Sequence, residues 1–312
     1  MAFLFPGQGS QSPGMGRELA ALYPVARHTF QEADDALGFA LSKLCFEGPA
    51  EQLRMTENTQ PAILTASVAA ARVLQEKGVV PQFVAGHSLG EYSAHVAAGT
   101  LDFADAVRTV RNRGKYMQEA VPAGQGAMAA VLGMAQPLVQ QVCADAAQGE
   151  VVSSANINSA EQIVISGAAK AVERAAALAK ERGAKRAIML DVSAPFHCAM
   201  MQPAQDRLAK DLESVAFSNP EVPVVANIDA EPKILAEACR EALVRQVTGA
   251  VQWEPCVRRL IQMGAGTFVE VGPGKVLTGL MRQIDRGQAA MNVEDEASLQ
   301  KVANLFAAAA SE

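Results

Sequence analysis

The chain has 312 residues, of which 50% are hydrophobic and 19% are charged, and its formal net charge is −6 at pH 7. A chain of this length and composition can bury a full core, which favours one large domain, alone or with a smaller one inserted. The negative charge argues against broad nucleic-acid binding. No apolar run reaches about 18 residues and no basic segment precedes the first strand, so we expect neither a membrane span nor a signal peptide.

The first 124 residues follow a strand–turn–helix pattern. Ala2–Phe5 predicts a short buried strand that ends in a glycine-rich loop at 6–11, and helical patterns follow to about residue 78. A second strand is predicted at Gln82–Ala85, followed by a helix of small residues at Leu89–Ala98 and a helix that Asp102 can cap. This alternation is typical of a parallel α/β sheet.

Residues 125–192 have a different order of predicted elements: strand, helix, strand, strand, helix, strand. These elements are expected at Ala127–Leu132, Gln136–Ala147, Val151–Asn156, Gln162–Ser166, Ala169–Arg182 and Ala187–Val192. The order is the ferredoxin-like pattern. We therefore expect residues 125–192 to form an inserted subdomain, and residues 1–124 and 193–312 to form the main domain.

The α/β pattern resumes after the insert. Strands are predicted at Val222–Ala226, Thr267–Val271 and near Ala289–Val293, and helices near 234–247, 252–263 and 275–284 and from Ser298. The predicted fold class is therefore α/β, with a parallel sheet in the main domain and a ferredoxin-like insert.

The cysteines of the chain are scattered. No CxxC pair or Cys/His cluster has the spacing of metal ligands, so we expect no metal site. An odd number of separated thiols is typical of a reducing compartment, and we therefore expect a cytoplasmic protein. The five are Cys45, Cys143, Cys198, Cys239 and Cys256.

Ser88 is the strongest candidate for a nucleophile. Of the serines in the chain, it alone has glycine both two positions before and two positions after, at Gly86 and Gly90. Small residues there let a strand and a helix approach around a sharp turn that exposes the serine. The turn also leaves the Leu89 backbone N–H free to face an oxyanion. The alternative is a glycine-rich turn with an incidental serine.

A serine hydroxyl needs a general base, and the chain has four histidines. We expect His28 on a helix surface, His87 pointing away from its neighbour Ser88, and His95 in an i,i+4 pair on its helix. His197 lies just after the insert, where a returning loop can present a residue to a cleft. It is the candidate base, although it could also be a core histidine with its hydrogen bonds satisfied. No acidic third partner is evident, and a backbone carbonyl could orient the ring instead.

Two further residues are candidates for the same site. Gln8, in the loop after the first strand, could donate its backbone N–H to an oxyanion or could belong to a plain turn. Arg113 lies at the edge of the buried stripe of its helix. It could hold a carboxylate with two hydrogen bonds, or extend along the surface to solvent.

Taken together, the motifs resemble those of the malonyl-CoA:acyl-carrier-protein transacylase family of discrete bacterial fatty acid synthesis. The resemblance covers nearly the whole length. In chain order, its motifs are Phe5-Pro6-Gly7-Gln8-Gly9-Ser10-Gln11, Thr59-Gln60-Pro61-Ala62, Gly86-His87-Ser88-Leu89-Gly90-Glu91-Tyr92, Arg113-Gly114-Lys115, Asn156-Ile157-Asn158-Ser159, Pro195-Phe196-His197, Pro223-Val224-Val225-Ala226-Asn227, Val251-Gln252-Trp253 and Glu270-Val271-Gly272-Pro273-Gly274.

The resemblance implies a large α/β-hydrolase-like domain with a ferredoxin-like insert, and it assigns roles to single residues. Ser88 would be the nucleophile and His197 the base, oriented by main-chain carbonyl groups. The oxyanion would be bound by the backbone N–H groups of Gln8 and Leu89. The substrate-binding residues would be Arg113, as the clamp of the malonyl carboxylate, with Gln252, Phe196 and Asn158. Phenylalanine before the histidine favours malonyl over methylmalonyl.

The implied reaction is a ping-pong transfer from malonyl-CoA to the phosphopantetheine thiol of acyl carrier protein, without a cofactor. We expect a monomer that meets an acidic carrier protein transiently, on basic clusters at 111–115, 180–186 or 258–259. The alternatives are a serine esterase or thioesterase, an acyltransferase of a polyketide pathway, and a non-catalytic scaffold subunit.

Overall fold

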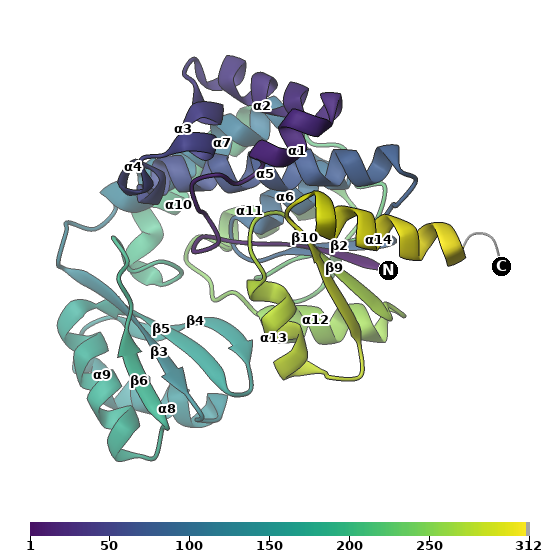
Figure 1. Ribbon diagram of the computed structural model, residues 1–312. Helices are drawn as coiled ribbons and strands as arrows, with labels where there is room; N and C mark the ends of the chain where they lie inside the picture. Colours follow the sequence, from purple (N-terminus) through teal and green to yellow (C-terminus); the bar gives the residue numbers. More distant parts are fainter. Residues whose placement is uncertain (310–312) are drawn as a thin grey trace.

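The computed structural model describes residues 1–309 and contains two sheets (Figure 1). The larger sheet has six strands in the order β10-β9-β1-β2-β7-β8. Five of them run parallel, and β8 pairs antiparallel with β7 at the edge. Their bounds are Ala2–Phe5 (β1), Phe83–Gly86 (β2), Val224–Val225 (β7), Pro232–Lys233 (β8), Thr267–Val271 (β9) and Ala289–Val293 (β10).

Alternate residues of the central strand face opposite sides of this sheet. In β1, Phe3 and Phe5 join one hydrophobic cluster, whereas Ala2 and Leu4 join another. Successive side chains of a strand point to opposite faces, and helices cover both faces of a parallel sheet. All four residues of β1 are therefore buried, and the sequence reads as an unbroken apolar run.

Helices form the layers on either side (Figure 1). The cluster around Phe3 and Phe5 is completed mainly by α2, α5 and α7, and the other by α12 and α13. The helices of the main domain are α1 (Arg17–Leu22), α2 (Pro24–Leu37), α3 (Leu41–Glu47), α4 (Ala50–Arg54), α5 (Thr56–Glu76), α6 (Gly90–Ala97), α7 (Phe103–Glu119), α10 (Gln202–Ser214), α11 (Ala236–Arg245), α12 (Trp253–Gln262), α13 (Val276–Ile284) and α14 (Glu296–Ala309). No helix among residues 1–309 is both long and apolar enough to cross a bilayer.

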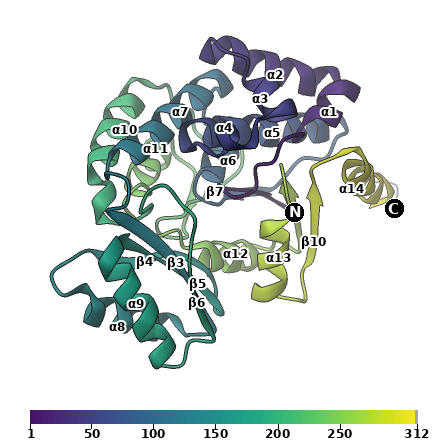
Figure 2. The ribbon, with the colours of Figure 1, turned by 60° about the vertical axis from the view of Figure 1, so that its left-hand side comes forward.

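The smaller sheet has four antiparallel strands in the order β4-β5-β3-β6. Two helices cover one of its faces, away from the larger sheet (Figure 2). This is the ferredoxin-like arrangement that the order of elements predicts. The elements are β3 (Gly126–Leu132), α8 (Gln136–Ala147), β4 (Val152–Ser159), β5 (Gln162–Ala168), α9 (Ala169–Glu181) and β6 (Arg186–Met189), and all of them lie within 125–192.

The sequence did not predict every strand correctly. The edge strand β8 was not expected, because it has only two residues and begins with a proline, which is tolerated at an edge. The last strand of the insert, β6, ends at Met189, three residues earlier than expected. Leu190 and Val192, which follow it, line a cleft between the two sheets.

Strand β4 joins the small sheet to the main domain. It has two irregularities in its pairing with β5, and between them Asn156 forms an isolated bridge with Val251. Next to it, Ser159 Oγ donates a hydrogen bond to Gln283 Oε1 of α13 at 3.0 Å. Bulges of this kind redirect side chains of a strand, and here Asn156 and Asn158 both line the cleft.

Candidate active site

Ser88 lies on a sharp turn between β2 and α6. Its φ angle is 51°, which is unusual for a residue with a side chain. The two glycines are required by contacts: a Cβ on Gly86 would lie 1.9 Å from the carbonyl carbon of Gly90, and a Cβ on Gly90 would lie 2.1 Å from the Phe5 carbonyl oxygen. The turn therefore presents Ser88 at the carboxyl end of the central strands, where ligands bind in α/β sheets.

His197 faces Ser88 from the segment after the insert. Ser88 Oγ donates to His197 Nε2 at 2.7 Å, and His197 Nδ1–H donates to the backbone carbonyl of Gln246 at 2.9 Å. That second bond selects the tautomer with a free lone pair on Nε2. Burial, together with the positive charge of Arg113, lowers the pKa of His197 to about 3. The ring is therefore neutral and able to accept a proton at physiological pH.

Arg113 reaches the same point from α7. It is 1% exposed, and Nη2 donates both to Ser88 Oγ, at 3.1 Å, and to Gln246 Oε1, at 2.8 Å. Nη1 donates to Gln60 Oε1 at 2.8 Å, while the buried Nε has no hydrogen-bond partner among the described residues. A buried guanidinium held only by neutral groups retains the capacity to bind an anion.

The glutamine of this site is Gln246 rather than Gln252. Gln246 follows the last residue of α11, is fully buried, and contacts both His197 and Arg113. Gln252 precedes α12 and donates its backbone N–H to the Asn227 carbonyl, and its side chain makes no hydrogen bond to Ser88, His197 or Arg113. The sequence offered no local signal for Gln246, because a residue at the end of a surface helix has no pattern that marks an inward side chain.

Two backbone N–H groups at the cleft have no hydrogen-bond acceptor among residues 1–309. Gln8 and Leu89 both line it, and neither N–H donates a hydrogen bond to another group of residues 1–309. The neighbouring Ser88 N–H is already bound, by Asn227 Oδ1 at 2.7 Å. Free donors beside a nucleophile are what a developing oxyanion requires.

The cleft has a volume of about 270 Å³. Phe196, next to His197, forms part of its wall and is 8% exposed. Asn158 lies on the opposite wall, where its Oδ1 accepts a hydrogen bond from His87 Nε2 at 2.8 Å. Apolar side chains line the remaining wall from the small sheet and its exit segment; they are Met128, Ala130, Val164, Leu190 and Val192.

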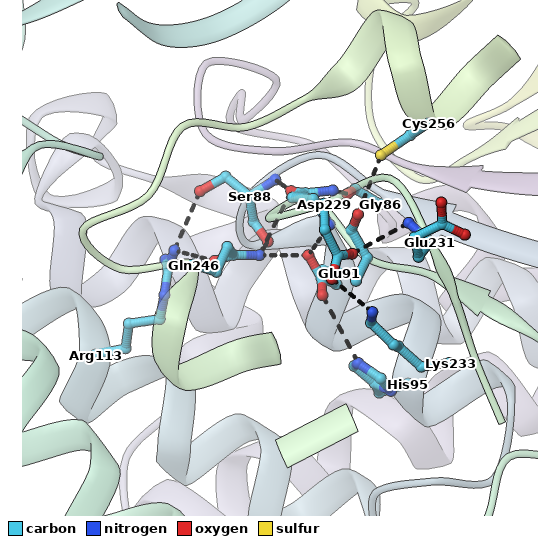
Figure 3. A network of polar contacts seen from close by, with 12 residues as sticks. Gly86, Ser88, Glu91, His95, Arg113, Asp229, Glu231, Lys233, Gln246 and Cys256 are labelled. Carbon is cyan, nitrogen blue, oxygen red and sulfur yellow. Dashed lines mark hydrogen bonds and ion pairs between the residues drawn. The ribbon is translucent and has the colours of Figure 1, made fainter. Parts of the chain in front are cut away.

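A polar network lies behind Ser88 (Figure 3). Glu91 Oε2 accepts from the Asn227 backbone N–H at 2.9 Å and from Gln246 Nε2 at 2.7 Å. His95 Nε2 lies 4.0 Å from Glu91 Oε1, and both side chains are fully buried. The sequence predicted an ordinary i,i+4 pair here, whereas the structure buries it because α6 packs between the sheet and α5.

The basic clusters at 111–115, 180–186 and 258–259 are partly paired with acids. In the first, Lys115 lies 4.0 Å from Glu119. In the other two, the ion pairs are Arg182–Asp145, Lys185–Glu161, Arg258–Glu254 and Arg259–Glu231. Such pairs reduce the net positive charge that each cluster presents to a partner.

The chain is similar to a known family and to known proteins over nearly its whole length. Residues 2–304 match the model of the acyl transferase domain family. The chain is 54% identical over 284 residues to the malonyl CoA-acyl carrier protein transacylase of Escherichia coli strain K12, which covers 91% of this chain and 92% of that protein. It is 50% identical over 301 residues to the protein of the same name from Bacillus subtilis strain 168, covering 96% and 95%.

Solved structures agree with this similarity. An acyl carrier protein S-malonyltransferase from Vibrio cholerae superposes with a TM-score of 0.95 at 50% identity, covering 96% of this chain and 99% of that one. A malonyl-transacylase solved in complex with a type II PKS acyl-carrier protein gives the same TM-score at 50% identity, covering 97% and 98%. The predicted fold class is therefore confirmed.

Proposed function

This chain belongs to the acyl transferase family, and we propose that it transfers a malonyl group from malonyl-CoA to acyl carrier protein, the reaction after which its matched relatives are named. The mechanism that we propose rests on the arrangement of three side chains. Ser88 Oγ lies 2.7 Å from His197 Nε2 and 3.1 Å from Arg113 Nη2, so a nucleophile, a base and a carboxylate-binding cation share one cleft.

The first half of the reaction forms an ester on Ser88. His197 Nε2 takes the Ser88 proton while Oγ attacks the thioester carbonyl carbon. The oxyanion that forms accepts hydrogen bonds from the backbone N–H groups of Gln8 and Leu89, each contributing a factor of roughly 10²–10³ in rate. The carbon–sulfur bond then breaks, and His197 returns the proton to the sulfur of coenzyme A.

The second half reverses these steps with another thiol. The phosphopantetheine thiol of the carrier protein gives its proton to His197 and attacks the malonyl ester. Ser88 leaves and recovers the proton from His197. Every proton moves between Ser88, His197 and a thiol, so the proposed reaction requires no cofactor besides its two substrates.

Arg113 selects the acyl group in this proposal. The substrate carboxylate accepts hydrogen bonds from the guanidinium, whose Nε has no partner in the cleft. An acetyl group has no carboxylate to pair directly with this cation. Breaking a buried ion pair by removing one member costs about 3–5 kcal/mol, which is enough to favour malonyl strongly. Gln60 and Gln246 keep the guanidinium in place between turnovers.

We also propose the compartment, the oligomeric state and the carrier-protein contact of the enzyme. Five cysteines are buried and free, which supports a reducing, cytoplasmic compartment. We infer a monomer that binds an acidic carrier protein transiently through the basic groups of the clusters named above. Charge reversal within a docking cluster should raise the apparent KM for carrier protein and leave the KM for malonyl-CoA unchanged. An unchanged carrier-protein KM would remove that cluster from the interface.

The decisive experiment is a labelling and chase. The protein is incubated with malonyl-CoA, and peptide mapping by mass spectrometry is expected to locate one malonyl adduct on Ser88. Carrier protein bearing phosphopantetheine should then remove the adduct and become malonylated. Steady release of free malonate without carrier protein would instead identify a hydrolase. No adduct on Ser88 would refute the mechanism, and Ser88→Ala provides the blank.

A further inference from the structure

Behind Ser88 lies a buried carboxylate that the reaction described above does not use. Glu91 lies in the first turn of α6, just after the turn that holds Ser88, and it is 0% exposed. Its Oε2 is held by the Asn227 backbone N–H and by Gln246 Nε2, whereas Oε1 has no hydrogen-bond partner among the described residues. An ionised carboxylate is costly to bury unless its charge has a function or a partner.

Gln246 links this carboxylate to the reacting groups (Figure 3). Its Nε2 donates to Glu91 Oε2 and to the Ser88 carbonyl at 3.0 Å, and its Oε1 accepts from Arg113 Nη2. Its backbone carbonyl orients His197. Because Glu91 can only accept a hydrogen bond when ionised, it fixes which end of the Gln246 amide faces Arg113.

Glu91 is also the counter-charge of Arg113. Among residues 1–309 the Arg113 guanidinium makes no direct ion pair. Burial is the largest influence on both groups and disfavours their ionised forms, whereas the charge of Glu91 favours the ionised form of Arg113 and the charge of Arg113 favours the ionised form of Glu91. One buried positive charge and one buried negative charge of the protein therefore balance each other through the Gln246 amide.

The remaining groups that face Glu91 do not supply a second positive charge. Burial is the main influence, and it raises the pKa of Glu91 to about 7. His95, beside Oε1, is kept neutral because burial lowers its pKa to about 3. Lys233 is paired with Asp229 at 2.7 Å. The other titratable groups that face Glu91 are Tyr92 on α6, Cys239 on α11, Cys256 on α12 and Asp229 after β7.

We propose that Glu91 is a positioning residue that acts through Gln246 on Arg113 and His197, and that it takes up a proton from solvent when a substrate carboxylate pairs with Arg113. The inference rests on the proposed function. A second carboxylate at a single buried cation leaves one negative charge without a partner. Glu91 Oε1, which has no donor, is the atom that receives the proton. The Ser88 proton goes to the leaving sulfur, so it does not reach Glu91.

Proton uptake can be measured on an enzyme that binds but does not react. Ser88→Ala is titrated with malonyl-CoA and with acetyl-CoA by calorimetry, in buffers of different ionisation enthalpy. The two ligands share coenzyme A, so their difference isolates the carboxylate. At pH 8, we expect the protein to take up about one more proton per site on binding malonyl-CoA than on binding acetyl-CoA. At pH 6 the difference should be much smaller, because Glu91 is already protonated. If malonyl-CoA and acetyl-CoA give the same proton uptake at pH 8 as well as at pH 6, the inference is overturned.

Kinetics of Glu91→Gln test the same inference in the active enzyme. Glutamine keeps an acceptor for Asn227 and Gln246 but cannot ionise. For the parent enzyme, kcat/KM with malonyl-CoA should fall by up to about tenfold per pH unit above pH 7, whereas kcat/KM with acetyl-CoA should not. Glu91→Gln should abolish this difference between the two substrates.

The matched control is Glu231→Gln, a nearby carboxylate that is exposed and paired with Arg259. It should retain the pH profile of the parent. A Glu91→Gln enzyme that keeps the parent profile overturns the inference, and if that variant does not fold, the calorimetry decides alone. Absence of a malonyl adduct on Ser88 would refute the proposed function, whereas a normal adduct with no differential proton uptake would refute only the role of Glu91.

Discussion

Among the described residues, no carboxylate is hydrogen-bonded to the His197 ring. The Gln246 carbonyl orients the ring, and burial, with the charge of Arg113, lowers its pKa and keeps it neutral. A carboxylate in contact with Nδ1 would favour the imidazolium, whereas Arg113 disfavours it. The base therefore stays neutral while the cation beside it remains free to bind an acid. The buried carboxylate of this site, Glu91, reaches His197 only through Gln246.

Arg113→Ala tests acyl selection. We expect kcat/KM for malonyl transfer to fall by about 10²–10³-fold, the equivalent of about 3–4 kcal/mol of a lost ion pair, while acetyl transfer rises relative to malonyl. The measurement is adduct formation on Ser88 with each thioester. Arg111→Ala, on the same helix, is the control, because Arg111 bonds Asn58 and lies over the Phe39 ring away from the cleft. Unchanged selectivity in Arg113→Ala would remove Arg113 from acyl recognition.

His95 makes stability depend on pH. Its pKa is about 3 in the folded chain, against an ordinary value of 6.5, and neither ring nitrogen has a hydrogen-bond partner among the described residues. The unfolded chain binds a proton below pH 6.5 and the folded chain does not. Above pH 6.5, His95 is neutral in both states and does not affect the free energy of unfolding. As the pH falls from 6.5 toward 3, His95 lowers the free energy of unfolding by about 1.4 kcal/mol per pH unit.

His95→Leu should remove the share of the pH dependence of stability that His95 contributes, while the share of the buried His87 and His197 remains. In urea unfolding at a series of pH values, we expect the variant to be at least as stable as the parent at pH 7 and to gain on it steadily below pH 6.5. His28→Leu, at an exposed position of α2, should leave the pH dependence unchanged. A His95→Leu curve parallel to that of the parent would show that His95 is not kept neutral by burial.

Among the elements, the β2–α6 turn depends most strictly on sequence. Gly86→Ala would place a Cβ against the backbone of Gly90, which cannot move without separating strand from helix. We expect a loss of more than about 4 kcal/mol in the free energy of unfolding, or no folded protein.

Gly279→Ala is the matched control for that substitution. Gly279 lies inside α13, and nothing lies within 4 Å of a Cβ built there. Alanine is the better helix former, so chemical denaturation should show a gain of about 0.5–1 kcal/mol. Similar effects of the two substitutions would contradict the close approach at Gly86.

For the whole molecule, the active cleft depends on how the two sheets meet. The main domain supplies Ser88 and Arg113, while the small sheet supplies Asn158, which His87 holds across the cleft. Burial lowers the pKa of His87, so the ring stays neutral and Nε2 can keep its proton for Asn158. A single hydrogen bond beside the nucleophile therefore helps to set the distance between the walls.

Asn158→Ala should loosen this junction. We expect KM for both malonyl-CoA and carrier protein to rise by about 2–10-fold, the range of one lost hydrogen bond, with a smaller change in kcat. Lys185→Ala removes an exposed ion pair with Glu161 elsewhere on the small subdomain and should leave the KM for malonyl-CoA unchanged. A fall in kcat without a rise in KM would assign Asn158 to the chemical step instead.

Features that depend on neighbours in the chain could be predicted from sequence. The turn around Ser88 follows from the steric demands of Gly86 and Gly90, and the order of strands and helices follows from hydrophobic periodicity. Together these predicted the fold class and the position of the proposed nucleophile. The residues offered His197, Arg113, Gln8 and Leu89 only as candidates, the family resemblance assigned them roles, and the structure brings all four to the cleft.

Features that depend on distant residues were decided only by the tertiary structure. Ser88 and His197 are 109 positions apart, and no local pattern records the distance between their side chains. Gln246 was missed in favour of Gln252 because both lie near the junction of α11 and α12, and only packing determines which one points inward. The same holds for Glu91 and His95, whose burial follows from the layers around α6, since exposure is a property of the assembled fold.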